Sequence, residues 1–197
     1  MALTGFAYES ERAQLARLCV SLKKSGVLIL GIVTILLAVA GVLLLLIDAS
    51  LGWLLAALSA WPLMVIAWYK RYLTRLPANS SDSLDGRLEA DLLGRLPRDL
   101  TPQVLAAQIS EVTSAQFLMV RSGLSTQMLT QVLGNDPAAI PLVWAAVRDM
   151  QPSGIVKAST VVAALTKTSP ELVQLLPHLQ LDEDDLPKLA GWFTHLD

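Results

Sequence analysis

The sequence predicts an all-α protein in which a transmembrane helical hairpin precedes a bundle of small helices. The first observation is a pair of apolar runs, 26–47 and 51–69, that contain no charged residue. The second is the region from 84 onward, where apolar residues recur at helical spacing between cap-like residues. The third is that no stretch alternates apolar and polar residues as a half-buried strand does.

Residues 1–25 are the predicted amphipathic lead-in on the cytoplasmic side, with a helix over 6–24. One face of that helix is apolar and most basic residues lie away from it (Leu15, Leu18, Cys19 and Leu22 against Arg12, Arg17, Lys23 and Lys24). Either the helix lies in the membrane interface or it continues directly into the membrane. The single cysteine excludes an intrachain disulfide, and we interpret Cys19 as a packing residue rather than an acylation site.

Residues 26–69 are the predicted two-span hairpin. Its runs have 22 and 19 residues, enough to cross a hydrocarbon core about 30 Å thick. Only residues 48–50 separate them, so both flanks are expected on one side of the membrane. Small residues recur along each run (Gly31, Thr34, Ala38 and Gly41; Gly52, Ala56 and Ala60). They are expected to pack the two spans against each other, with dimerisation as the alternative.

The charges and aromatic residues around the hairpin predict its orientation. Residues 1–79 carry seven Lys or Arg and three Asp or Glu, and the turn carries only Asp48. Under the positive-inside rule both termini are cytoplasmic, at a bacterial-type inner membrane. Trp53 is expected near the outer interface, and Trp68, Tyr69 and Tyr72 near the inner one. The first run is too long for a signal peptide and a second run follows, so it is interpreted as uncleaved.

Composition excludes two classes of function. Neither run contains an ionisable side chain, which argues against a transporter, channel or proton relay. Residues 80–197 carry eight Lys or Arg against fourteen Asp or Glu, which argues against nucleic-acid binding. The hairpin is therefore interpreted as an anchor, in which Pro62 is expected to kink the second span.

Residues 70–83 are the predicted juxtamembrane linker, and 84–197 the helical domain. Helices are expected near 84–96, 102–111, 114–122, 126–133, 137–150, 160–168, 170–178 and 183–196. Thr101, Ser169 and either Asn135 or Asp136 precede prolines, as N-caps do before proline at the first helical position. Gly123 and Gly134 are typical of helix C-terminal stops.

A shift of 57 residues superposes two segments of this domain without a gap. Val104-Leu-Ala-Ala107 coincides with Val161-Val-Ala-Ala164, and Leu118-Met119 with Leu175-Leu176. The shared positions are mostly apolar and helically spaced, as expected for two copies of one small helical unit.

This arrangement resembles the Clp amino-terminal domain, which caps the Clp-family AAA+ unfoldases and consists of two tandem four-helix repeats. The resemblance covers about residues 80–196 and is better in the second copy, from 140 to the last helix. The Glu-His-Leu-Leu sequence frequent in the family is absent, because those positions read Pro102-Gln-Val-Leu105 and Thr160-Val-Val-Ala163. The resemblance implies a recognition module that receives substrates or adaptors and passes them to an ATPase ring.

The sequence offers no constellation for catalysis. It has no Gly-x-x-x-x-Gly-Lys-Ser/Thr loop, so an ATPase would lie in a partner or beyond Asp197. His178 and His195 have no second ligand at metal-binding spacing, and no cofactor is expected. The acidic run 182–185 is interpreted as the cap and first turn of the last helix, with a cation site or a dock for a basic partner as the alternative.

Three residues are candidates for a partner-binding groove. Under the shift of 57, Phe117 coincides with Gln174 and Met128 with Asp185, so each apolar residue has a polar equivalent. Trp192 lies beside the apolar stripe of the last helix (Leu186, Leu189, Phe193 and Leu196). Exposed large apolar side chains often mark interfaces. The alternative is that all three belong to the core.

The sequence thus predicts a membrane-anchored domain that binds protein substrates or adaptors and recruits them to a Clp-type AAA+ unfoldase or protease at the cytoplasmic membrane face. Its expected partners are those proteins, the lipid bilayer and an AAA+ ATPase or peptidase. The alternative is a structural subunit that self-assembles as a homo-oligomer and scaffolds a membrane complex. Neither interpretation requires enzymatic activity.

Overall fold

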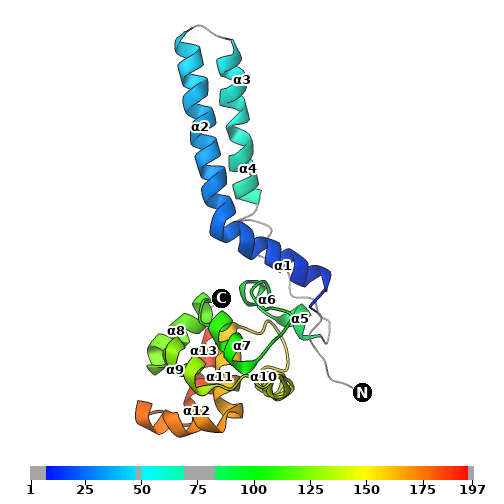
Figure 1. Ribbon diagram of the computed structural model, residues 1–197, viewed down its shortest axis with the longest axis vertical. Coiled ribbons are helices and arrows are strands. Elements are labelled where there is room, and N and C mark those ends of the chain that lie inside the picture. The colour runs from blue at the N-terminus through cyan, green and yellow to red at the C-terminus, as the bar shows by residue number, and fades with distance from the viewer. Residues whose placement is uncertain (1–7, 48–49, 69–82, 195–197) are drawn as a thin grey trace. The chain divides into compact units, whose positions relative to one another are not determined.

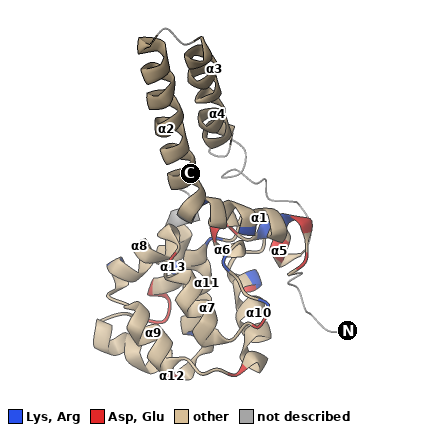
Figure 2. Ribbon diagram, turned by 45° about the horizontal axis from the view of Figure 1, so that its top comes forward, with Lys and Arg blue, Asp and Glu red and all other residues tan. Residues whose placement is uncertain are grey.

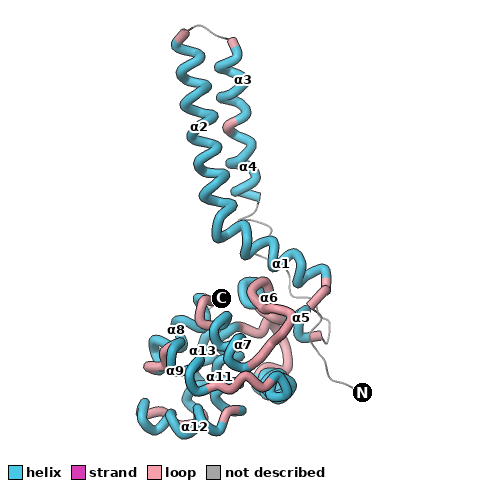
Figure 3. The backbone as a smooth tube through the Cα atoms, viewed as in Figure 1, coloured by secondary structure: helices cyan, strands magenta, loops and turns pink. Residues whose placement is uncertain are grey.

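The computed structural model describes residues 8–47, 50–68 and 83–194. Every regular element in these ranges is a helix, as the sequence predicts (Figure 1, Figure 3). The chain divides into two compact units: a hairpin unit, Gln14–Pro77, and a helical unit formed by Met1–Ala13 together with Ala78–Asp197. Predictions for Asp48, Tyr69, Tyr72, His195, Leu196 and most of the linker fall outside the described residues.

The hairpin unit consists of α2 (Val27–Leu46) packed along α3 (Leu51–Leu58) and α4 (Ala60–Trp68) (Figure 1). The helix Val27–Leu46 and the segment Leu51–Trp68 are each long and apolar enough to cross a membrane. Neither carries a Lys, Arg, Asp or Glu, so both are uniformly tan in Figure 2.

Two glycines permit the close packing of α2 on α3. A Cβ added at Gly41 would lie 2.9 Å from the backbone nitrogen of Ala56, and one at Gly52 would lie 2.7 Å from the Gly41 carbonyl oxygen. Any larger side chain would therefore force the backbones apart. Gly31, which shares the small-residue stripe of the first run, has no atom within 4 Å of an added Cβ.

The second run is interrupted near Pro62. Helix α3 ends at Leu58 and α4 begins at Ala60, so only Ser59 lies between them (Figure 3). A proline clashes with the carbonyl group four residues before it, which here belongs to Leu58. The predicted disturbance of this helix is thus present, one turn before the proline.

The lead-in contains α1 (Glu11–Ser21), followed by a π-helical turn, Leu22–Gly26, that leads into α2. The backbone stays helical across these junctions, as the hypothesis of a continuous helix requires. The predicted pattern fails at Arg12, which is only 9% exposed because its guanidinium donates hydrogen bonds to backbone carbonyls of the helical unit. Leu18 is 55% exposed, as an apolar side chain at a membrane interface would be in the protein alone.

The helical unit is built from short helices connected by tight turns (Figure 1). In chain order they are α5 (Leu84–Arg87), α6 (Ala90–Leu93), α7 (Pro102–Ile109), α8 (Thr113–Ser122), α9 (Thr126–Val132), a 3₁₀ turn Pro137–Ala139 with α10 (Ile140–Met150), α11 (Ala158–Thr168), α12 (Pro170–Leu175) with a 3₁₀ turn Leu176–Leu179, and α13 (Asp185–Thr194). Helix α11 lies at the centre and contacts α7, α8, α10, α12 and α13.

One predicted helix, 84–96, is wrong. It is divided into α5 and α6 by extended backbone at Leu88 and Glu89. The reason is a tertiary contact: Glu89 N–H donates to the Val156 carbonyl oxygen (2.8 Å), and Val156 N–H donates to the Arg87 carbonyl oxygen (2.8 Å). Extended backbone at this point brings Leu88 and Val156 together, and both are fully buried.

The helix boundaries follow the same shift of 57 residues as the sequence. It carries Thr113, the start of α8, onto Pro170, the start of α12, and Pro102 to within one residue of the start of α11. One equivalent pair also packs alike, since α7 contacts α9 and α11 contacts α13. Equivalent elements therefore occupy equivalent positions in chain order and share this contact.

Most of the predicted caps are confirmed. The hydroxyl of Thr101 accepts from Val104 N–H (3.3 Å), and a carboxylate oxygen of Asp136 accepts from Ala138 N–H (2.9 Å). Gly123 ends α8 with a φ of 70°, a conformation that favours glycine. Gly134 follows the end of α9, although its φ is not positive.

Candidate partner-binding surface

Helix α8 presents large apolar side chains outward. Phe117 is 51% exposed and Val120, three residues later on the same helix face, is 83% exposed. The opposite face of α8 is anchored by Leu118 and Ala115, which are fully buried. The sequence indicated Phe117 but missed Val120, although its spacing from Phe117 was a usable signal.

Met128 lies in the first turn of α9 and is half-buried. Its backbone N–H donates to the Ser125 hydroxyl (3.1 Å), which caps the helix. At the equivalent position of α13, the Asp185 carboxylate accepts from the backbone N–H of Asp182 (2.9 Å). The two helices thus use opposite halves of a capping box, so Asp185 has a capping role that Met128 cannot have.

Trp192 is 72% exposed near the end of α13. The same helix buries Leu186 and Ala190 in the core, and it contacts both α8 and α11. The alternative that all three candidates are core residues is therefore wrong for Phe117 and Trp192. The side chain of Phe193 lies outside the described residues.

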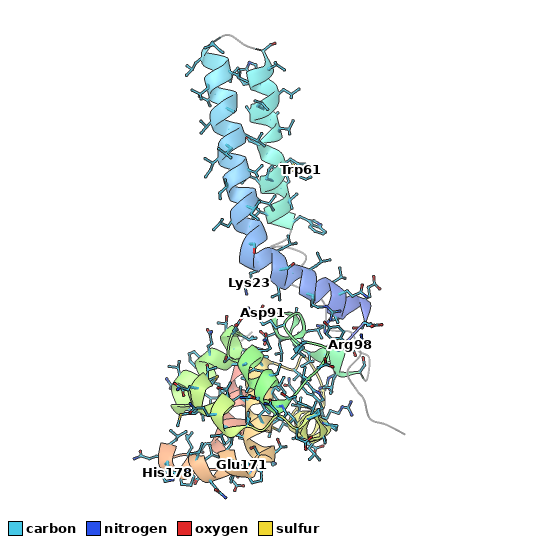
Figure 4. The ribbon with its side chains drawn as sticks, viewed as in Figure 1. Lys23, Trp61, Asp91, Arg98, Glu171 and His178 are labelled. Atoms are coloured by element: carbon cyan, nitrogen blue, oxygen red, sulfur yellow. The ribbon has the colours of Figure 1, made fainter. Side chains whose placement is uncertain are left out.

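The surface of the described residues offers no metal centre. No group of three His, Cys, Asp or Glu side chains in the described ranges is arranged to hold an ion. His178 lies exposed on the 3₁₀ turn after α12 (Figure 4). The Asp182–Asp185 hydrogen bond supports the interpretation of the acidic run as a helix cap.

The pKa values of two side chains, Cys19 and Glu171, are shifted from their ordinary values. Burial raises the pKa of the Cys19 thiol, which favours the less nucleophilic protonated form. The carboxylate of Glu171 accepts a hydrogen bond from its own backbone N–H and another from the Ser169 hydroxyl, and both lower its pKa.

Comparison with protein-family models, with curated proteins and with solved structures finds no match.

Proposed function

We propose that this protein is a membrane-anchored recognition domain that binds a segment of a protein substrate or adaptor and recruits it to a Clp-type AAA+ unfoldase or protease. The observation that carries the proposal is the exposure of Phe117, Val120 and Trp192 on two helices that contact each other, α8 and α13. Large apolar side chains exposed together are typical of protein interfaces.

The helical unit supports this role because its core does not require these side chains. The inner faces of α8 and α13 are already occupied by buried residues, among them Leu118, Leu186 and Ala190. A partner segment that covers Phe117 and Trp192 would gain the hydrophobic free energy of that apolar surface. The tandem order of similar helices supports the Clp-like assignment of residues 84–197, which rests on the resemblance described above.

The hairpin supplies the anchor in this proposal. Both flanking segments contribute to the helical unit, since Arg12 bonds to the carbonyl groups of Asp85 and Leu88. The hydrogen bonds of Arg12 require the segments before and after the hairpin to lie on the same side of the bilayer. A chain that crosses the bilayer twice meets this requirement, because it returns to its starting side. With the positive-inside rule, that side is the cytoplasm. Anchoring raises the local concentration of captured partners at the membrane.

The test is affinity purification of the full chain in mild detergent, with and without a slowly hydrolysed ATP analogue, followed by mass spectrometry. The variant Phe117→Gln with Met128→Asp places at each position the residue of the equivalent position. We expect this double variant to remain folded and to lose the partner. We expect the same result for the separate variant Trp192→Gln. The matched control is Leu142→Gln, which removes a side chain that is 64% exposed on α10.

An AAA+ protein or peptidase that is recovered with the wild type and Leu142→Gln, and lost in the other variants, would support the proposal. Recovery of this chain alone as a fixed oligomer, indifferent to nucleotide, would contradict it. That outcome would support the second candidate, a self-assembling scaffold subunit. The observation that favours the scaffold is Gly31, whose open surroundings on α2 would admit a helix from another copy.

A further inference from the structure

A cavity of about 230 Å³ opens in the helical unit where four helices begin or end. It is bounded by the first residue of α7, the loop after α9, α10, and the junction of α11 with α12. Its floor consists of Leu133, Val143 and Leu165, which are 6%, 2% and 1% exposed. The floor is therefore apolar and belongs to the core.

The rim of the cavity is acidic. Asp136 and Glu171 both line it, and both residues are exposed. Glu171 lies at the start of α12 (Figure 4). The lining contains no Lys, Arg or His. The Asp136 carboxylate caps Ala138, and Glu171 accepts from the Ser169 hydroxyl (2.8 Å), so both carboxylates are held in place and keep lone pairs for a ligand.

The helix starts at this cavity do not favour an anion. Pro102, Pro137 and Pro170 occupy the first positions of their helices and have no backbone N–H to offer. Near two of these starts, the N–H groups of Val104 and Ala138 already donate to the side chains of Thr101 and Asp136. The charged residues that line the cavity, Asp136 and Glu171, are thus both acidic, and the two capped N–H groups are already bonded.

The walls of the cavity are tied together before any ligand binds. The Thr101 hydroxyl, next to α7, donates to the Asn135 side-chain oxygen at 3.1 Å. The Gln103 side chain donates to the Thr130 carbonyl oxygen at 2.8 Å, which joins α7 to α9. A preformed site loses little free energy to ordering when it binds.

We propose that this cavity binds the side chain of a lysine or arginine in a protein partner. The apolar stem would lie on Leu133, Val143 and Leu165, and the cationic head would meet the carboxylates of Asp136 and Glu171. Long basic side chains pair an apolar stem with a charged head in this manner. The cavity is smaller than typical small-molecule sites, and its exposed acidic rim leaves room for a peptide main chain outside it.

This site shares no residue with Phe117, Met128 and Trp192, so it extends the proposed function instead of restating it. The surrounding charge supports the assignment. Residues 80–197 carry eight Lys or Arg against fourteen Asp or Glu, and a negative field raises the association rate of basic segments.

The test is a methyl NMR titration of the full chain in detergent micelles, with Leu133, Val143 and Leu165 as reporters. The probes are glycine-serine peptides that carry one central lysine, arginine, norleucine or glutamate. We expect the lysine and arginine peptides to shift these methyl signals and to bind about tenfold more tightly than the norleucine peptide, the effect of one charge-assisted hydrogen bond.

The test variants are Asp136→Asn, which keeps a capping oxygen, and Glu171→Gln, which keeps an acceptor for Ser169. In the double variant the preference for lysine over norleucine should fall to about twofold or less. The matched control is Asp149→Asn, which removes an exposed carboxylate outside the cavity lining and should leave the preference unchanged.

Equal binding of the lysine and norleucine peptides would overturn the proposal, as would an equal loss in Asp149→Asn. Free arginine or lysine that binds as tightly as the peptides would overturn the assignment to a protein partner. The variant Phe117→Gln with Met128→Asp should leave this titration unchanged, which separates this site from the proposed interface on α8 and α13.

Discussion

Arg12 lies among the positive charges that precede the first candidate span, yet its side chain is buried. The guanidinium donates from Nη2 to the Leu88 carbonyl oxygen at 2.9 Å and from Nη1 to that of Asp85. Burial lowers the pKa of Arg12, and the nearby Asp85 carboxylate raises it in part. This residue therefore has a structural role in the helical unit in addition to its contribution to the positive charge before the first candidate span.

We expect Arg12→Met to destabilise the helical unit by about 2 kcal/mol, because two buried carbonyl groups lose a charged donor. The measurement is chemical denaturation followed by the fluorescence of Trp144, which is 6% exposed, together with hydrogen exchange of the 84–93 amides. The control Arg121→Met removes an exposed arginine from α8 and should change stability by less than about 0.5 kcal/mol. Unchanged exchange in 84–93 would contradict this role for Arg12.

Glu171 offers a second residue-scale prediction, on pH. Its pKa is lowered in the folded chain, so its carboxylate stabilises the fold above the ordinary value near 4.5, and this contribution is lost as the pH falls through the lowered value. In Ser169→Ala one of the two hydrogen bonds is absent, so the pKa should rise toward the ordinary value.

Carboxyl-carbon NMR of Glu171 would measure this change directly. Acid unfolding of the variant should begin at a higher pH than in the wild type, whereas stability near neutral pH should change less. The control is Ser153→Ala, in the exposed loop after α10. A pKa for Glu171 that is the same in Ser169→Ala and the wild type would show that the hydroxyl does not stabilise the carboxylate.

At the scale of elements, the packing of α2 on α3 depends on Gly41 and Gly52. Both are buried, and an added Cβ at either would come within 3.0 Å of backbone atoms on the facing helix. Of the small residues that recur along α2, Gly41 therefore packs against the facing helix, whereas Gly31 makes no such contact. Gly41, which is packed against α3, and Gly31, which is not, therefore form a matched pair for mutagenesis.

We expect Gly41→Leu to destabilise the hairpin unit by roughly 1–3 kcal/mol, the usual cost of overpacking, whereas Gly31→Leu leaves it folded. The measurement is SDS titration of the full chain, followed by the fluorescence of Trp53 on α3. If Gly31→Leu instead dissociates an oligomer in detergent, the scaffold hypothesis gains direct support. Equal destabilisation by both substitutions would contradict the packing described here.

At the scale of the whole molecule, one compact unit is formed from chain segments on both sides of the two candidate spans. Because Arg12 precedes the spans and Asp85 follows them, their contact requires both flanks on one side of any membrane that the spans cross. From the excess of Lys and Arg next to the hairpin and the positive-inside rule, we propose that this side is the cytoplasm.

Cysteine accessibility tests this topology. In a Cys19→Ser background, Ser50→Cys in the turn should react with a membrane-impermeant maleimide on intact cells. Ser153→Cys, in the exposed loop after α10, should react only after permeabilisation. The reverse pattern would place the helical unit outside the cytoplasm, and labelling of both sites on intact cells would contradict two crossings.

The sequence by itself determined the features that depend on neighbouring residues. The starts of α7 and α9 and of the 3₁₀ turn before α10 follow from Thr101, Ser125 and Asp136, because a cap bonds only two or three residues ahead. The apolar runs likewise were sufficient to predict the extent of the two candidate spans and their helical structure. Of the candidate surface, Phe117 and Trp192 were predictable as exposed residues, and Val120 was missed.

Only the tertiary structure decided the features that depend on distant partners. The break between α5 and α6 arises because Leu88 and Glu89 pair with Val156. The Glu89 carboxylate then accepts from Ala158 N–H at 3.1 Å, and so caps α11 from 69 residues away. The burial of Arg12 depends on carbonyl groups 73 and 76 residues away. Local propensity contains no information on such contacts, because their free energy exists only once the chain has brought the segments together.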